Sequence, residues 1–246
     1  MHADAKPSLI ILHGSNGSGA TMRALVDAVR AEVDAYTPNM LAHGGRPVPK
    51  HITIEDLATD IIAYMDEQHL LHAYVFGYSS GACLALYLAR HFPERFDGVC
   101  TLAAKYVFDP KTVAHWMYLT NPERLGRPGN KRAAELAETH APQDWVEVTN
   151  SNRRLFEEYG LNPPLLEKDL RAIPIPALLF SSDKDQLVPL SETLALGKLI
   201  ADSRVVTFAG QAHPLSIVPL TTMARTMCDW ISEIEDRGAV KRRSTG

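Results

Sequence analysis

Apolar and polar positions follow two different periods along the chain. Six short apolar runs predict buried strands: Ser8–Leu12, Val33–Tyr36, Ala73–Phe76, Gly98–Leu102, Ala177–Phe180 and Val205–Phe208. Segments with apolar residues at helical spacing lie between and after these runs: Thr21–Arg30, Ile54–Gln68, Ala82–His91, Ser191–Leu199 and Leu220–Glu235. This alternation predicts an α/β fold, with a mainly parallel sheet of about six strands and helices on both faces.

The stretch between the fourth and fifth runs breaks the alternation. It contains no convincing strand, and its clearest helical patterns are Lys131–Thr139 and Trp145–Tyr159. A structureless loop of this length is uncommon in a compact domain. We therefore predict that residues 105–172 form a small helical cap inserted after the fourth strand, and that residues 1–104 and 173–246 form the core. Such a cap would cover the carboxyl ends of the strands, where open parallel sheets bind ligands.

Composition excludes several classes of function. The chain has 246 residues, 46% of them hydrophobic, and a net charge of −4, so no basic surface indicates nucleic-acid binding. No apolar stretch approaches the ~20 residues of a membrane span. The cysteines, Cys83, Cys100 and Cys228, are too scattered for a disulfide framework or a zinc site, and we expect them to be buried. A reduced, cytoplasmic location and a small-molecule partner are the resulting expectations, and the oligomeric state stays open.

The strongest local motif is Gly77-Tyr78-Ser79-Ser80-Gly81. It lies between the third predicted strand and the helix that follows it. In a G-x-S-x-G turn between a strand and a helix, the central serine is held in a strained conformation with its hydroxyl exposed. The glycines are required there because a Cβ atom would collide with the neighbouring strand or helix. A simple strand-to-helix connection is the alternative explanation.

A glycine-rich turn, His13-Gly14-Ser15-Asn16-Gly17, follows the first predicted strand. Its backbone N–H groups are candidates for stabilising an oxyanion, and we expect His13 itself to hold the turn by hydrogen bonds. A dinucleotide site is the competing interpretation. It is disfavoured because the glycine spacing is G-x-x-G-x-G, not G-x-G-x-x-G, and because no acidic residue closes the second strand.

Carboxylates follow the fifth predicted strand, and an imidazole follows the sixth. Asp183 and Asp185 come after the fifth strand, and His213 comes after the sixth. A serine hydroxyl needs a neutral imidazole to accept its proton, and that imidazole needs a carboxylate to orient it. This requirement is met by Ser79, one of these acids and His213. Each follows a predicted strand of one parallel sheet, so all three lie at the same end of that sheet. Asp109, after the fourth strand, is the alternative acid.

These motifs together resemble the α/β-hydrolase fold with a helical cap, over roughly residues 8–235. His13–Gly17 matches the HGxxG turn of that family, and Gly77–Gly81 matches its nucleophile elbow. Ser182–Pro189 is similar to its acid segment, G-x-x-D-x-x-V-P. Gly210–His213 matches its G-x-x-H loop.

The resemblance assigns roles that spacing alone leaves open. It implies Asp185, rather than Asp183, as the acid beside His213. It also implies an oxyanion hole made by the backbone N–H groups of Ser80 and Ser15. No cofactor and no metal ligand set is implied.

The sequence also departs from the family pattern. Ser182 replaces a glycine before the acid, and the turn Pro38–Gly44 carries Asn39 and Ala42 where the family has Asp and Gly. These changes affect loop shape rather than chemistry. The antiparallel hairpin that many members carry first is not expected, which gives six strands instead of eight.

The resulting functional hypothesis is a serine hydrolase that cleaves a small ester, thioester or related acyl compound. Hydrolysis of a carbon–carbon bond in a dienoic diketone by the same triad is an alternative. A slow-turnover protein that binds or senses a small ligand is another. The aromatic residues expected to contact the substrate are Tyr78, Trp116 and Trp145.

Overall fold

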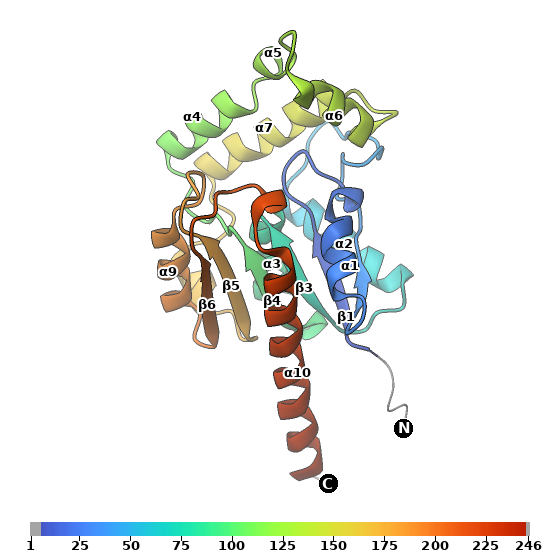
Figure 1. Ribbon diagram of the computed structural model, residues 1–246, viewed down its shortest axis with the longest axis vertical. Helices are drawn as coiled ribbons and strands as arrows, with labels where there is room; N and C mark the ends of the chain where they lie inside the picture. Colours follow the sequence, from blue (N-terminus) through green and yellow to red (C-terminus); the bar gives the residue numbers. More distant parts are fainter. Residues whose placement is uncertain (1–5, 245–246) are drawn as a thin grey trace.

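The computed structural model describes residues 6–244, and within them six parallel strands form one sheet (Figure 1). The strand order is β2-β1-β3-β4-β5-β6. The strands are β1 (Ser8–Leu12), β2 (Asp34–Tyr36), β3 (Ala73–Tyr78), β4 (Phe96–Leu102), β5 (Ala177–Ser182) and β6 (Ser203–Phe208). Central strands β1, β3, β4 and β5 are almost wholly buried, as expected of parallel strands covered on both faces.

Helices cover both faces of the sheet. The helices of the sheet layers are α1 (Arg23–Val29), α2 (Ile54–Glu67), α3 (Ser80–His91), α9 (Leu190–Leu199) and α10 (Leu220–Ser244). Apolar side chains of α1 and α10 share one buried cluster with β1, β4 and β5, and those of α2, α3 and α9 share another. Short 3-10 turns lie at Gly19–Met22, Pro93–Arg95 and Leu215–Ile217. The predicted α/β class and six parallel strands are thus confirmed.

Some sequence-based details need correction. β3 continues through Gly77 and Tyr78, because both still pair with β4. β6 begins at Ser203, paired with Ala177, although its first residues are polar or half-exposed. Cys83 and Cys100 are buried, but Cys228 is only half-buried, because it lies at the edge of the apolar stripe of α10.

The chain between β4 and β5 is helical, and its first four helices lie over one end of the sheet (Figure 1). These are α4 (Pro110–Leu119), α5 (Pro122–Leu125), α6 (Lys131–His140) and α7 (Trp145–Leu161); α8 (Glu167–Arg171) follows. Helix α7 packs against α4 and α6, whereas α8 packs against α3 and α9. Side chains of α7 also enter the buried cluster beneath α2 and α3. The helices therefore pack onto the sheet layers as well as on one another. No helix in residues 6–244 is long and apolar enough to cross a membrane.

Candidate active site

Ser79 occupies the turn between β3 and α3. Its backbone has φ 55° and ψ −115°, a strained conformation for a residue with a side chain. Close packing explains the flanking glycines. A Cβ atom on Gly77 would lie 2.2 Å from the carbonyl oxygen of Gly81, and one on Gly81 would lie 2.5 Å from that of His13. The turn therefore needs glycine on both sides to hold Ser79 at the sheet edge.

A hydrogen-bond chain joins Ser79, His213 and Asp185. Nε2 of His213 is 3.1 Å from Oγ of Ser79, and Nδ1 of His213 is 2.7 Å from Oδ2 of Asp185. Because a carboxylate only accepts hydrogen bonds, Nδ1 carries the proton and Nε2 accepts from the serine hydroxyl. The other oxygen of Asp185 accepts the backbone N–H groups of Leu187 and Val188, which fix the carboxylate.

The competing acids have other roles. Asp183 accepts the N–H of Gly210 (2.7 Å) and so ties its own loop to the loop that carries His213. Asp109 caps helix α4 by accepting the N–H of Thr112. Neither carboxylate contacts His213, so of the three acids only Asp185 is placed to orient the imidazole.

Ser80 and Ser15 line the cavities at Ser79, and their backbone N–H groups have no hydrogen-bond acceptor among residues 6–244. Ser80 begins helix α3, so its N–H has no intrahelical partner, and the helix dipole favours negative charge there. Ser15 lies in the turn after β1, and its N–H donates to no other described residue. The hydroxyls of both serines are buried and have no hydrogen-bond partner in the described part of the chain.

Two cavities meet at Ser79, His213, Trp116 and Leu187. The larger, of about 590 Å³, extends between α3, α4, α7 and α9. The smaller, of about 470 Å³, extends along the turn after β1 toward α6. A substrate whose scissile bond lies at Ser79 would therefore have one cavity for each of its two products.

Tyr78 and Trp116 lie at this junction, whereas Trp145 does not. The hydroxyl of Tyr78 donates to the carbonyl of His213 (3.0 Å), and burial raises the pKa of Tyr78 to about 12. Trp116 stacks on Phe156, and its buried indole N–H has no acceptor among the described residues. Trp145 lines neither cavity, since it lies at the start of α7 near Gly126.

Cys83 also lines the larger cavity, one helical turn after Ser79. Burial raises the pKa of its thiol to about 12. At neutral pH the thiol is therefore protonated and a poor nucleophile, unlike a hydroxyl hydrogen-bonded to imidazole.

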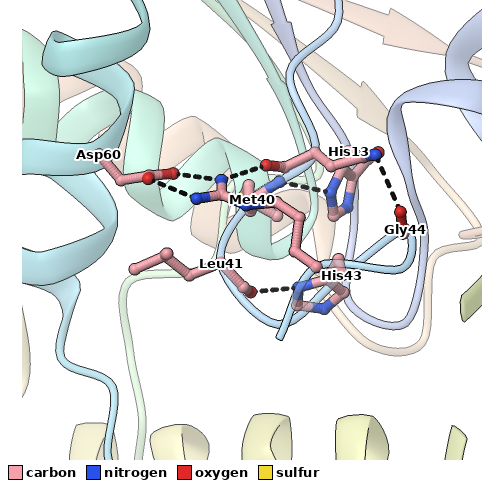
Figure 2. Close-up of polar contacts among 8 residues, drawn as sticks. His13, Met40, Leu41, His43, Gly44 and Asp60 are labelled. Carbon is pink, nitrogen blue, oxygen red and sulfur yellow. Dashed lines mark hydrogen bonds and ion pairs between the residues drawn. The ribbon is translucent and has the colours of Figure 1, made fainter. Parts of the chain in front are cut away.

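A cluster of buried histidines behind the site was not predicted from the sequence, apart from the role of His13 in its turn. Nδ1 of His13 donates to the carbonyl of Gly14 (2.9 Å), and Nε2 accepts from the N–H of Met40 (3.2 Å). Figure 2 shows His13 beside His43, whose Nδ1 donates to the carbonyl of Leu41 (2.7 Å). The bond from Met40 to His13 joins the turn after β1 to the turn at Pro38–Gly44, which the sequence marks only as a departure from the family pattern.

The same cluster reaches the helices above the sheet. The side-chain amide of Asn152, on α7, donates to Nε2 of His43 (3.0 Å) and to the side chain of Asn16 (2.7 Å). His140, at the end of α6, accepts from the N–H of Gly44 and donates to the carbonyl of Asn16. Only the fold reveals this cluster, because its members are distant in sequence and have no motif spacing.

Every histidine of the cluster is neutral. Each ring donates with one nitrogen and accepts with the other, a pattern that imidazolium, with two donors, does not satisfy. Burial lowers the pKa of His13 and His140, and it lowers the pKa of His43 to about 4. The cluster is therefore a set of fixed neutral hydrogen bonds at neutral pH.

The sequence has clear relatives. Residues 9–226 match the model of the Alpha/beta hydrolase family. The chain belongs to this family and is a hydrolase.

Two curated relatives carry more specific names. A protein described as a carbamate hydrolase, from Caulobacter sp., is 27% identical over 221 residues, covering 77% of this chain and 77% of the relative. A pimeloyl-[acyl-carrier protein] methyl ester esterase from Aeromonas hydrophila is 25% identical over 233 residues, covering 84% and 88%.

Solved structures show the same fold at lower identity. A meta-cleavage product hydrolase from Pseudomonas fluorescens aligns with a TM-score of 0.77 at 21% identity, covering 93% of this chain and 92% of that structure. A likeness at this identity supports the fold alone, not the substrate.

Proposed function

We propose that this hydrolase cleaves a small ester, thioester or related acyl compound through an acyl-enzyme formed on Ser79. The observation that carries the proposal is the hydrogen-bond chain from Ser79 through His213 to Asp185. The backbone N–H groups of Ser80 and Ser15, which have no acceptor among the described residues, support it. Each part matches a requirement of acyl transfer: a nucleophile, a base, an orienting carboxylate and an oxyanion site.

In the first half of the reaction, Nε2 of His213 takes the proton of Ser79 as Oγ attacks the carbonyl carbon. Asp185 stabilises the imidazolium that forms. The N–H groups of Ser80 and Ser15 stabilise the oxyanion, each worth about 3–4 kcal/mol by analogy with measured oxyanion-hole donors. His213 then protonates the leaving group, and the acyl group stays on Ser79.

In the second half, His213 deprotonates a water molecule that attacks the acyl-enzyme. The same N–H groups stabilise the second oxyanion, and Ser79 leaves with the proton returned by His213. No cofactor enters this scheme.

The curated relatives support acyl chemistry. Their names describe cleavage of a carbamate and of a methyl ester, both of which carry a carbonyl attached to a heteroatom leaving group. An ester or related compound is thus favoured over a dienoic diketone.

We further propose that residues 105–172 act as a cap over the site. Trp116 and Phe156 come from this segment and line the larger cavity, and Trp116 also lines the smaller. Tyr78, from the core, completes the wall beside His213. The cap would then set which substrates reach Ser79. The cytoplasmic location expected from the cysteines stays a prediction.

Replacing Ser79 with alanine tests the proposal. Ser79→Ala should lower kcat on short p-nitrophenyl esters by roughly 10⁴-fold or more, because no other group supplies the nucleophile. The matched control is Ser232→Ala, which removes an exposed hydroxyl on α10 that lines neither cavity. It should remain close to wild type.

The remaining alternatives give different results on a wider panel. Normal ester turnover by Ser79→Ala would refute the proposal. Rapid cleavage of a dienoic diketone with negligible ester turnover would identify a carbon–carbon bond hydrolase. Saturable ligand binding with negligible turnover on the whole panel would favour a binding or sensing protein.

A further inference from the structure

Lys105 and Glu192 form a buried ion pair in the wall of the larger cavity. Lys105 follows β4, and Glu192 lies in the first turn of α9. Nζ of Lys105 is 2.5 Å from Oε2 of Glu192, and the side chains are only 12% and 8% exposed. Both residues line the cavity that also contains Ser79 and His213. A charged pair therefore lies in the chamber of the reacting serine.

Within the described residues, most acceptor sites of Glu192 are occupied, whereas most donors of Lys105 are not. Oε1 of Glu192 accepts the backbone N–H groups of Tyr106 and Val107, and Oε2 accepts from Lys105. The ammonium group of Lys105 has three N–H donors, and Glu192 is its one hydrogen-bond partner among residues 6–244. The pair is therefore richer in spare donors than in spare acceptors.

The surroundings favour an acceptor on the ligand. Asp109, another carboxylate lining this cavity, already accepts the N–H of Thr112. Most of the deeper wall is apolar, formed by Cys83, Phe108, Trp116, Phe156, Tyr159 and Val188. Lys111 and His115 also line this cavity but are exposed, whereas the ammonium group of Lys105 is buried in its wall. A ligand with an apolar body and an acceptor at one end would match this wall.

We propose that Lys105, oriented by Glu192, binds a carboxylate at the end of the substrate remote from the cleaved bond. The substrate class is then an ester or thioester with an apolar body that ends in a carboxylate. This inference rests on the proposed function, because it names the substrate of the Ser79 reaction. Lys105 is a specificity residue in this scheme, and Glu192 positions it.

Matched substrates test the inference. Esters are made with a methyl, carboxamide or carboxylate end group over a range of chain lengths, with the group on the acyl side in one series and on the alcohol side in the other. In one series, wild-type kcat/KM should be higher for the carboxylate than for the carboxamide, by on the order of ten-fold. The series that shows the preference identifies which product occupies the larger cavity.

Variants assign the preference to Lys105. Lys105→Met should lower kcat/KM for the carboxylate to about that for the carboxamide. Glu192→Gln, which removes the countercharge, should increase the carboxylate preference. The control Lys168→Met removes an exposed lysine of α8 that lines neither cavity, so the preference should persist. If Lys105→Met does not fold, Lys105→Met with Glu192→Gln removes both charges together and should also lose the preference.

The failures are distinguishable. If neither series shows a carboxylate preference, or if Lys105→Met retains it, the inference is overturned and the pair serves only to join β4 to α9. If wild-type protein fails on the methyl-ended esters and on all others, the proposed ester chemistry itself is refuted.

Discussion

At the scale of single residues, the structure decides between chemically equivalent groups. Asp183 and Asp185 are two residues apart in one loop, and sequence spacing does not separate them. The side chain of Asp185 is 1% exposed and contacts His213. The carboxylate of Asp183 instead accepts the backbone N–H of Gly210. The difference arises from the turn Leu187–Val188, whose N–H groups bind one oxygen of Asp185 and aim the other at the imidazole.

This choice predicts unequal effects of two matched substitutions. Asp185→Asn should lower kcat by roughly 10³–10⁴-fold, because an amide N–H facing Nδ1 favours the wrong tautomer of His213. Asp183→Asn keeps an acceptor oxygen for Gly210 and should have a far smaller effect. Steady-state kinetics of the purified variants, with circular dichroism to verify folding, check this. Equal losses in the two variants would contradict the assignment.

At the scale of elements, the junction of β3 and α3 depends on close approach of backbone to backbone. Ser79 is held in its conformation because the strand and the helix meet with no side chain between them. A Cβ atom added at this junction would collide with backbone atoms. A Cβ atom added to an open loop would only disfavour a positive φ.

A comparison of two Gly→Ala substitutions measures this difference. Gly77→Ala places a Cβ atom 2.2 Å from the backbone oxygen of Gly81, so it should lower the free energy of unfolding by about 4 kcal/mol or more, or prevent folding. A Cβ atom on Gly129 would lie within 4 Å of no atom that the structure describes, so Gly129→Ala has only the φ of +84° to accommodate, at a cost of about 1–2 kcal/mol. Chemical denaturation gives both values, and similar losses would contradict the packing argument.

At the scale of the whole molecule, the neutral histidine cluster joins the sheet layers to the helices above the site. It connects the turn after β1, the turn at Pro38–Gly44 and helices α6 and α7. The turn after β1 and helix α6 border the smaller cavity at Ser79, and α7 borders the larger. Protonation of the cluster would therefore weaken the attachment of the proposed cap.

The pKa of His43 predicts how stability depends on pH. It is about 4 in the folded protein and near 6.5 in the unfolded chain, so the unfolded chain binds more protons between these values. The free energy of unfolding therefore has its full value with respect to His43 above pH 6.5. It falls by roughly 3 kcal/mol as the pH decreases toward 4. Denaturation at a series of pH values between 7.5 and 5 measures the slope.

Two histidine variants separate this effect from general acid destabilisation. His43→Gln should reduce the slope of unfolding free energy against pH, because it removes one buried titrating group. His51→Gln removes an exposed histidine and should leave the slope unchanged. An unchanged slope in His43→Gln would mean that other groups account for the acid sensitivity.

Hydrophobic periodicity determined the sheet and its helices, because burial on two faces leaves a local pattern in each strand and helix. The motifs around Ser79 and His213 were equally local, since strained turns require particular glycines. By contrast, the partner of Lys105 and the contacts of His43, His140 and Asn152 are far away in sequence. No local pattern distinguishes a buried lysine or histidine from an exposed one.

The sequence by itself therefore determined the α/β class, the candidates Ser79 and His213 at the ends of predicted strands, and, through resemblance to the family, Asp185. Tertiary structure alone decided that Trp145 lines neither cavity, that two cavities meet at Ser79, and that Lys105 and Glu192 lie together in the wall of the larger one. The physical reason is that secondary structure and tight turns are set by neighbours along the chain. Cavity walls and buried polar clusters are assembled from side chains whose proximity exists only after the sheet and the helices over it have packed.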